Sequence, residues 1–323
     1  MNEKIYGLIE ENPDVRDWRM GSITGARKEV LREDGDWRDF VPSEEEIQAG
    51  VYFDTYACVT FSALNNLEMI AKAKGIEMNR SDRFTAKMSG TTTSGNSLRN
   101  VATSVSRWHG TVAEEDWPFP RTQRTPVFDW DDYYKEIPQE LQDLGLSWLE
   151  DWDVSFEWIP TDKESIREAL KYGPLQVGVY AYPKPLENGM YDDGGRDRRN
   201  HAVTLIYAGD DCYEILDHYE RSGKITKRLV PDYDFKWIMQ FTLNPKKDKP
   251  MPIIDLPNDC LVQLVEGKGG FGLHVDGKLY VDDTDKILAS WLVRSPEFGR
   301  KKAITQAQWD SFPKFNLKNE PLD

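Results

Sequence analysis

The sequence has few of the residues from which disulfide scaffolds and metal sites are built. Its 323 residues include only three cysteines and four histidines. Three cysteines can form at most one disulfide, which argues against a disulfide-built secreted scaffold and favours a reducing compartment. No Cys-x-x-Cys or His-Glu-x-x-His pattern occurs, so we expect neither a metal site nor any other cofactor.

The sequence also lacks long apolar runs and an excess of positive charge. No stretch approaches the roughly 20 apolar residues that span a bilayer, and residues 1–6 do not form an apolar signal segment. The 41 basic and 56 acidic residues give a net charge of −15, which argues against nucleic acid or an anionic membrane as the partner. These features leave the compartment open and favour a cytoplasmic or virion-associated protein over a secreted one.

Composition along the chain predicts three parts. Residues 1–35 are polar and broken by glycine and proline, so we expect an extended segment there. Residues 36–245 are expected to form the main domain, with Trp37 and Phe40 anchoring its start. A Lys- and Pro-rich linker then leads to residues 251–323, which we expect to be a small β-rich appendage.

Hydrophobic periodicity changes midway through the main domain. Spacings of three and four predict helices over 58–74, 97–108 and 138–144, and Thr161 begins a capping-box pattern before a further helix. Beyond Pro174, runs rich in Val, Ile and Tyr predict strands over 175–180, 202–207, 213–216, 225–230 and 237–243. The appendage shows strand patterns over 261–266 and on both sides of residues 276–277, and a helical pattern over 305–312. Helices followed by strands indicate an α+β domain of two lobes.

Three residues far apart in the sequence could form a nucleophilic site. Cys58 begins the first predicted helix, where the helix dipole and a nearby imidazolium would lower the pKa of its thiol. His201 opens one predicted strand and Asp217 ends the next. If these strands are antiparallel neighbours, Asp217 can bind one nitrogen of His201 and orient it as a base for Cys58. Each residue also has an ordinary structural role open to it: a buried thiol, a strand-edge histidine and a turn aspartate.

The surroundings of these residues resemble the papain-like cysteine proteases. His201 follows Cys58 by 143 positions, within the range typical of that family, and Asp217 follows His201 by 16. The resemblance spans residues 36–243 and includes the motifs Val59-Thr60-Phe61-Ser62-Ala63, His201-Ala202-Val203, Gly173-Pro174-Leu175 and the loop 108–119. It implies a two-lobed α+β fold with a helical first lobe and an antiparallel, β-barrel-like second lobe. The low cysteine content is similar to that of bacterial and bacteriophage members.

The sequence departs from the family pattern at several positions. Asp217 stands where the family usually has asparagine. The family's glutamine, which donates to the oxyanion about six positions before the nucleophile, is replaced by Tyr52. Gln48 and Asp54 are the other nearby candidates, Asp54 only in a protonated state. Loss of one such donor costs roughly 10²–10³ in rate in a well-studied case.

Substrate contacts follow from the resemblance alone. The stretch Gly95-Asn96-Ser97 matches the glycine-rich wall along which the family binds an extended peptide, and Asn200 precedes the proposed base. Asn96 or Ser97 could equally cap the helix that begins at Leu98.

The resemblance implies a cysteine peptidase that cleaves polypeptides through a Cys58-His201-Asp217 triad and a covalent acyl-enzyme. One alternative is a weakly active or inactive scaffold within a larger assembly, such as a phage particle, with residues 251–323 as a contact surface. Another acyl transfer, as by an amidase or a transglutaminase-like enzyme, is a further alternative. Residues 1–35 lack the long amphipathic helices of the family's propeptides, so we expect no inhibitory segment of that kind.

Overall fold

The computed structural model describes residues 6–11, 17, 19–20, 29–42, 48, 54–118, 130–221 and 224–246. Beyond these it describes the backbone of five short strands in the last part of the chain. The chain divides into two compact units, Met1–Lys246 and Lys247–Asp323, which are described separately below. None of the helices in the described residues is long and apolar enough to cross a bilayer.

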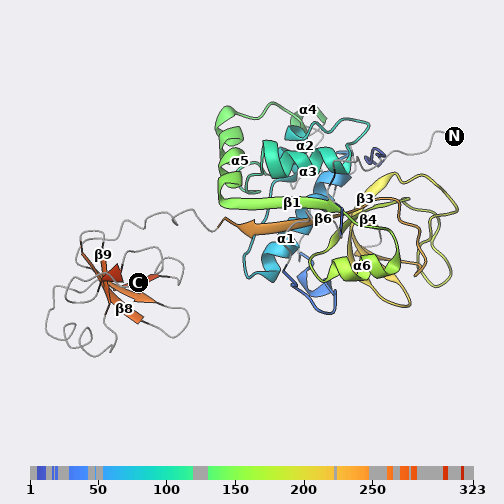
Figure 1. Ribbon diagram of the computed structural model, residues 1–323. Helices are drawn as coiled ribbons and strands as arrows, with labels where there is room; N and C mark the ends of the chain where they lie inside the picture. The colour runs from blue at the N-terminus through green and yellow to red at the C-terminus, as the bar shows by residue number, and fades with distance from the viewer. Residues whose placement is uncertain are drawn as a thin grey trace. The chain divides into compact units, whose positions relative to one another are not determined.

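The first unit begins with helices, as the periodicity predicts. Helix α1 (Cys58–Ala73) is buried along almost its whole length and is the central helix of the unit. Helices α2 (Asp82–Met88) and α3 (Leu98–Thr103) are capped by the hydroxyls of Ser81 and Ser97, and α3 continues as a π-helical turn, η2 (Ser104–Trp108). Helices α4 (Trp130–Tyr133) and α5 (Gln139–Asp151) complete the group. In Figure 1, helices α2 to α5 lie on one side of strand β1 (Trp152–Trp158).

The second half contains an antiparallel sheet of six strands in the order β1-β6-β2-β3-β4-β5. The edge strands β1 and β5 are not paired with each other in the described residues, so this sheet is open. Helix α6 (Lys163–Leu170) lies between β1 and β2 in the sequence. The strands are β1 (Trp152–Trp158), β2 (Leu175–Val179), β3 (His201–Ala208), β4 (Tyr213–Arg221), β5 (Lys224–Leu229) and β6 (Ile238–Pro245).

Two apolar clusters hold the helices on the sheet. One joins α1 and α3 to β1 and β6, and the other joins α6 to β2, β3 and β4. Trp37 is fully buried in the second cluster, and its indole donates to the Leu170 carbonyl at 2.7 Å. The expected anchoring role of Trp37 is therefore confirmed. Phe40, the last residue of the 3-10 turn η1 (Arg38–Phe40), packs against the same cluster.

The structure differs from the prediction in local details. Helix α2 and strand β1 were not predicted, and α5 extends seven residues beyond the predicted end at Leu144. Helix α6 is capped by Asp162 and not by Thr161: the Asp162 carboxylate accepts from the Ser165 amide at 2.9 Å. A carboxylate at this position satisfies a free amide and also interacts favourably with the helix dipole.

The second unit contains a five-stranded sheet in the order β10-β7-β8-β9-β11. Its members are β7 (Cys260–Leu264), β8 (Gly270–Val275), β9 (Lys278–Val281), β10 (Lys301–Ile304) and β11 (Lys314–Phe315). β7, β8 and β9 pair antiparallel, whereas both edge strands join in parallel. The predicted turn at 276–277 and the predicted helix over 305–312 lie outside the described residues.

Candidate active site

A tightly held turn places Cys58 at the first position of α1. Tyr56 adopts a positive φ of 54°, and its amide donates to Asp54 Oδ1 at 2.9 Å. Thr55 is tied to the Gln48 carbonyl through both its amide and its hydroxyl. These bonds fix the backbone from which the helix starts and hence the direction in which Cys58 projects.

The thiol of Cys58 is fully buried and free of any disulfide. Burial raises the pKa of this thiol, and the carboxylates of Asp54 and Asp217 raise it further. The backbone amide of Ala202, next to His201 in β3, lowers the pKa of the Cys58 thiol. The conformation described here therefore holds Cys58 as a neutral thiol beside the start of β3.

His201 and Asp217 are brought together by neighbouring antiparallel strands, as the sequence predicts. His201 Nε2 lies 2.7 Å from Asp217 Oδ1, and both side chains are fully buried. An ionised carboxylate can only accept, so Nε2 must carry the hydrogen. His201 Nδ1 has no hydrogen-bond partner in the described part of the chain, which leaves it able to accept a proton.

Asp217 is surrounded by donors. Its Oδ1 also accepts from the amide of His218 at 2.7 Å, and its Oδ2 lies 2.5 Å from the Lys227 ammonium. Burial alone would raise the pKa of Asp217, but His201 and Lys227 together hold it well below its usual range. Asp217 is therefore a carboxylate at all moderate pH values. The contact with Lys227 was not predicted, because nothing in the sequence marks one lysine on a neighbouring strand as buried.

A second buried imidazole, His218, directly follows Asp217 in β4. Its Nε2 is 2.9 Å from the Asn65 amide nitrogen, which can only donate, so Nε2 accepts. Burial lowers the pKa of His218 to about 3. His218 is thus a neutral structural residue.

The three candidates for an oxyanion donor have different positions. Tyr52 lies outside the described residues. Asp54 accepts hydrogen bonds from Tyr56, Gln48 and Tyr219, so it acts here as an acceptor. Gln48 is fully buried, and its side-chain amide donates to the backbone carbonyl of Tyr6 at 2.9 Å. Of the two described candidates, only Gln48 presents a donor that already holds a carbonyl oxygen.

Residues 6–11, here called the covering segment, lie against the predicted substrate-binding residues. The Asn96 amide donates to the Gly7 carbonyl, and the Asn96 carbonyl accepts from the Ile9 amide, both at 2.8 Å. The Leu8 amide donates to the Asn200 carbonyl at 3.4 Å. The stretch predicted as a peptide-binding wall is thus occupied in this structure by the chain's own residues 6–11.

Two glycines make this close approach possible. A Cβ on Gly95 would lie 1.8 Å from the Gly7 carbonyl oxygen, and a Cβ on Gly7 would lie 2.2 Å from the Tyr56 carbonyl oxygen. Both glycines also have positive φ. Ser97 caps α3 and accepts from the Asn100 amide at 3.3 Å, so the structural reading of this residue is the one observed.

Side chains at both ends of the covering segment fasten it. The Tyr6 ring lies 5.7 Å from the His201 ring and 5.4 Å from the Tyr219 ring. At the other end, Glu11 pairs with Arg99 at 3.1 Å, and Arg99 also pairs with Asp17 at 2.5 Å. The covering segment therefore contacts His201 through Tyr6 and shares an apolar cluster with Cys58 through Leu8.

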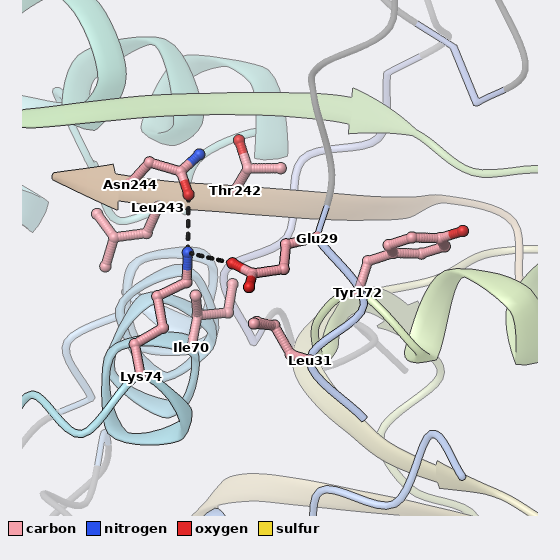
Figure 2. Close-up of a pocket in the computed structure, with 8 residues that line it drawn as sticks. All are labelled: Glu29, Leu31, Ile70, Lys74, Tyr172, Thr242, Leu243 and Asn244. Atoms are coloured by element: carbon pink, nitrogen blue, oxygen red, sulfur yellow. Dashed lines mark hydrogen bonds and ion pairs between the residues drawn. The ribbon is translucent and has the colours of Figure 1, made fainter. Parts of the chain in front are cut away.

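A separate hollow lies at the other end of α1 (Figure 2). It is lined by Lys74, which donates to Asn244 Oδ1 at 2.7 Å, and by apolar side chains including Ile70 and Leu243. α1 has 16 residues, which at 1.5 Å per residue puts the hollow about 24 Å from Cys58. Within the described residues, no group of three or more His, Cys, Asp or Glu side chains is arranged to hold a metal.

Comparisons with known proteins bear on the fold. No protein-family model and no curated protein matches the sequence. The solved structure of xylellain, a cysteine protease from Xylella fastidiosa, matches with a TM-score of 0.54 at 15% identity, over 74% of this chain and 98% of that one. The cysteine protease and lectin-like domains of Cwp84, a surface layer associated protein of Clostridium difficile, match with a TM-score of 0.50 at 15% identity, over 68% of this chain and 54% of that one. The chain therefore has the fold of the papain-like cysteine proteases.

Proposed function

We propose that this protein is a cysteine peptidase that hydrolyses peptide bonds through Cys58, His201 and Asp217. The observation that carries the proposal is the His201–Asp217 contact of 2.7 Å, which leaves Nδ1 without a partner among the described residues, while the backbone amide of the next residue, Ala202, contacts the Cys58 thiol. A thiol at a helix N-terminus beside an oriented imidazole is the arrangement that activates a sulfur nucleophile.

The reaction would proceed in two stages. The Cys58 proton moves to His201 Nδ1, and the thiolate attacks the substrate carbonyl to form a tetrahedral adduct. His201 then returns the proton to the leaving amine, which departs and leaves a thioester on Cys58. Water, deprotonated by the same nitrogen, attacks the thioester and releases the second product with the thiol restored. Asp217 keeps the hydrogen on Nε2 throughout and stabilises the imidazolium.

Gln48 is the side chain we propose as the oxyanion donor, together with the backbone amide of Cys58. The side-chain amide of Gln48 donates to the carbonyl oxygen of Tyr6. This contact supports the assignment, because the amide already binds the oxygen of a peptide group. Gln48 precedes Cys58 by ten positions and not by about six, so a search at the usual spacing selects Tyr52. One N–H of Gln48 and the backbone amide of Cys58 would together give a preorganised oxyanion site two donors.

The covering segment has to leave before a substrate can bind. It uses the amide and carbonyl of Asn96 and the carbonyl of Asn200, which an extended peptide substrate would need. Turnover would therefore depend on the fraction of molecules in which residues 6–11 are displaced. Sequence alone did not indicate this arrangement, because the covering segment is short, extended and lacks a helical pattern.

Covalent labelling tests the proposed function. Full-length protein is treated with a peptidyl epoxide, and the intact mass and the modified residue are determined for wild type, Cys58→Ala and His201→Ala. We expect single labelling at Cys58 in wild type, none in Cys58→Ala, and a loss of about 10²–10⁴ in rate for His201→Ala. Cys212→Ala, which removes the other described free thiol, is the matched control and should label like wild type. Equal labelling of wild type and His201→Ala would overturn the proposal, and so would no reaction at Cys58 in folded protein after displacement of the covering segment; the second result would favour a binding scaffold.

A further inference from the structure

Lys227 is a buried cation beside the proposed triad. It lies on β5, which pairs with β4, and only 6% of its surface is exposed. Its ammonium group is 2.5 Å from Asp217 Oδ2 and 2.9 Å from the Tyr219 carbonyl oxygen. Among the residues that the structure describes, no other Lys or Arg pairs with Asp217. A buried lysine is expensive to maintain unless it is paired, so this contact requires an explanation.

The charges around the proposed triad explain why a buried lysine is present there. Cys58 has to become a thiolate when His201 becomes an imidazolium. A bare carboxylate at position 217 would favour the imidazolium but would oppose the thiolate, because it raises the pKa of Cys58. Lys227 carries the opposite charge on the far oxygen of that same carboxylate. Seen from Cys58, the pair Asp217–Lys227 has no net charge.

We propose that Lys227 is a positioning residue that neutralises and orients Asp217, so that this pair acts on His201 as an uncharged hydrogen-bond acceptor. The inference rests on the proposed peptidase function of the same site. Lys227 touches neither His201 nor Cys58 in any contact described here; it acts through Asp217.

Other polar groups around Asp217 do not replace Lys227. His218 faces it from the next position of β4 and is neutral, since burial holds its pKa at about 3. Tyr219 donates its amide to Asp217 and its hydroxyl to Asp54, whose carboxylate opposes the thiolate as Asp217 does. The Tyr182 ring contacts both the Lys227 ammonium at 5.2 Å and the His201 ring at 6.1 Å but adds no charge. Lys227 is therefore the balancing cation.

A double-mutant cycle on the full-length chain tests the proposal. Wild type, Lys227→Met, Asp217→Asn and Asp217→Asn/Lys227→Met are alkylated with iodoacetamide between pH 4 and 9, and the rate at Cys58 is followed by peptide mass mapping. We expect Lys227→Met to raise the midpoint of the pH–rate curve by about one unit and to slow alkylation about tenfold near pH 6. Asp217→Asn leaves Lys227 buried without its charged partner, and alkylation of Cys58 should also be slower in this variant. The double variant restores neutrality and should return to within about threefold of wild type.

This recovery distinguishes charge balance from mere structural support. If Lys227 only held the strands together, the double variant would be at least as impaired as the single ones, and that result would overturn the proposal, as would a wild-type midpoint in Lys227→Met. Lys74→Met is the matched control, because Lys74 is also a partly buried, hydrogen-bonded lysine. Its alkylation curve should coincide with that of wild type.

A second readout is independent of access to the thiol. The fraction of His201 in the imidazolium form at pH 7, read from the ¹⁵N shifts of histidine-labelled protein, should rise in Lys227→Met and return in the double variant. No change in Lys227→Met would overturn the proposal. If the cycle behaves as expected but wild type fails to label with the peptidyl epoxide, the proposed function fails and the charge balance stands.

Discussion

The two ends of helix α1 differ in the burial and pairing of the charged side chains around them. At its start, Cys58, His201, Asp217 and Lys227 are almost completely shielded from solvent, and each charged group has a specific partner. Just beyond its end, Lys74 lines an open hollow and pairs loosely, at 3.9 Å, with Glu29, which is 73% exposed (Figure 2). One end has closely paired buried charges, and the other has an open hollow with a solvent-screened ion pair.

The hollow therefore lies at the end of α1 opposite to the proposed reactive residues. A screened pair such as Lys74–Glu29 contributes little to stability and can be lost at small cost. Buried charges such as Asp217 and Lys227 are retained only where their partners compensate for desolvation. The predictions below test the two ends against each other.

The largest effect is expected for Gln48→Ala. If its amide donates to the oxyanion, loss of that donor should lower kcat for a peptide substrate by about 10²–10³. Alkylation of Cys58 by iodoacetamide, which has no tetrahedral intermediate, should change far less. Steady-state kinetics and alkylation are compared with those of Gln142→Ala, whose amide donates to the Ile137 carbonyl away from the site. Equal losses in both assays would mean that Gln48 is only structural.

A pH-dependent effect on stability is expected from His218. Its pKa is about 3 in the folded protein, below the ordinary 6.5, because burial disfavours the charged form. The unfolded chain therefore binds more protons between these values, and the free energy of unfolding falls as pH drops below 6.5. The slope from this residue approaches about 1.4 kcal/mol per pH unit. Asp217, whose pKa is depressed, adds its own loss only below its ordinary value of 3.8.

Urea unfolding of wild type and His218→Gln between pH 7 and 4.5 measures this slope. In the variant, the free energy of unfolding should depend less steeply on pH over that interval. The side-chain oxygen of the glutamine can still accept the hydrogen bond from Asn65. His109→Gln is the control: His109 is only partly buried, and burial lowers its pKa as well, so it should flatten the curve less. A slope in His218→Gln identical to wild type would show that His218 is not a buried neutral base.

A moderate effect is expected from Arg99→Gln. Arg99 holds Glu11 and Asp17 at the end of the covering segment that lies away from Cys58. These pairs are partly exposed, so their loss should favour displacement of residues 6–11 by only about 1 kcal/mol, or about fivefold. Labelling by the peptidyl epoxide should become faster by that factor. Lys87→Gln, which breaks the exposed Lys87–Glu136 pair, should have no effect; a slower reaction in Arg99→Gln would mean that the covering segment does not limit access.

Sequence patterns predicted the architecture because its signals are local. The α1 periodicity, the change of period after Pro174 and the positions of Cys58, His201 and Asp217 each follow from short stretches, and the structure joins His201 to Asp217 as expected. β1 also had a local signal, apolar residues at 152, 154, 156 and 158, which was overlooked because it follows α5 without a break. The contact of Lys227 with Asp217 and the placement of residues 6–11 depend on pairings between distant segments. Such pairings have no local pattern.

The smallest effect is expected for Lys74→Met at the far end of α1. The substitution removes the hydrogen bond to Asn244 and the weak ion pair with Glu29. It also removes the free-energy cost of burying the ammonium group; this burial lowers the pKa of Lys74. These contributions oppose each other, so the free energy of unfolding should change by less than about 1 kcal/mol. Epoxide labelling of Cys58 should stay within about twofold of wild type, since the two ends share no charged contact among the residues that the structure describes. A large loss of labelling would show that the ends of α1 are coupled, and the hollow would then belong to the functional machinery after all.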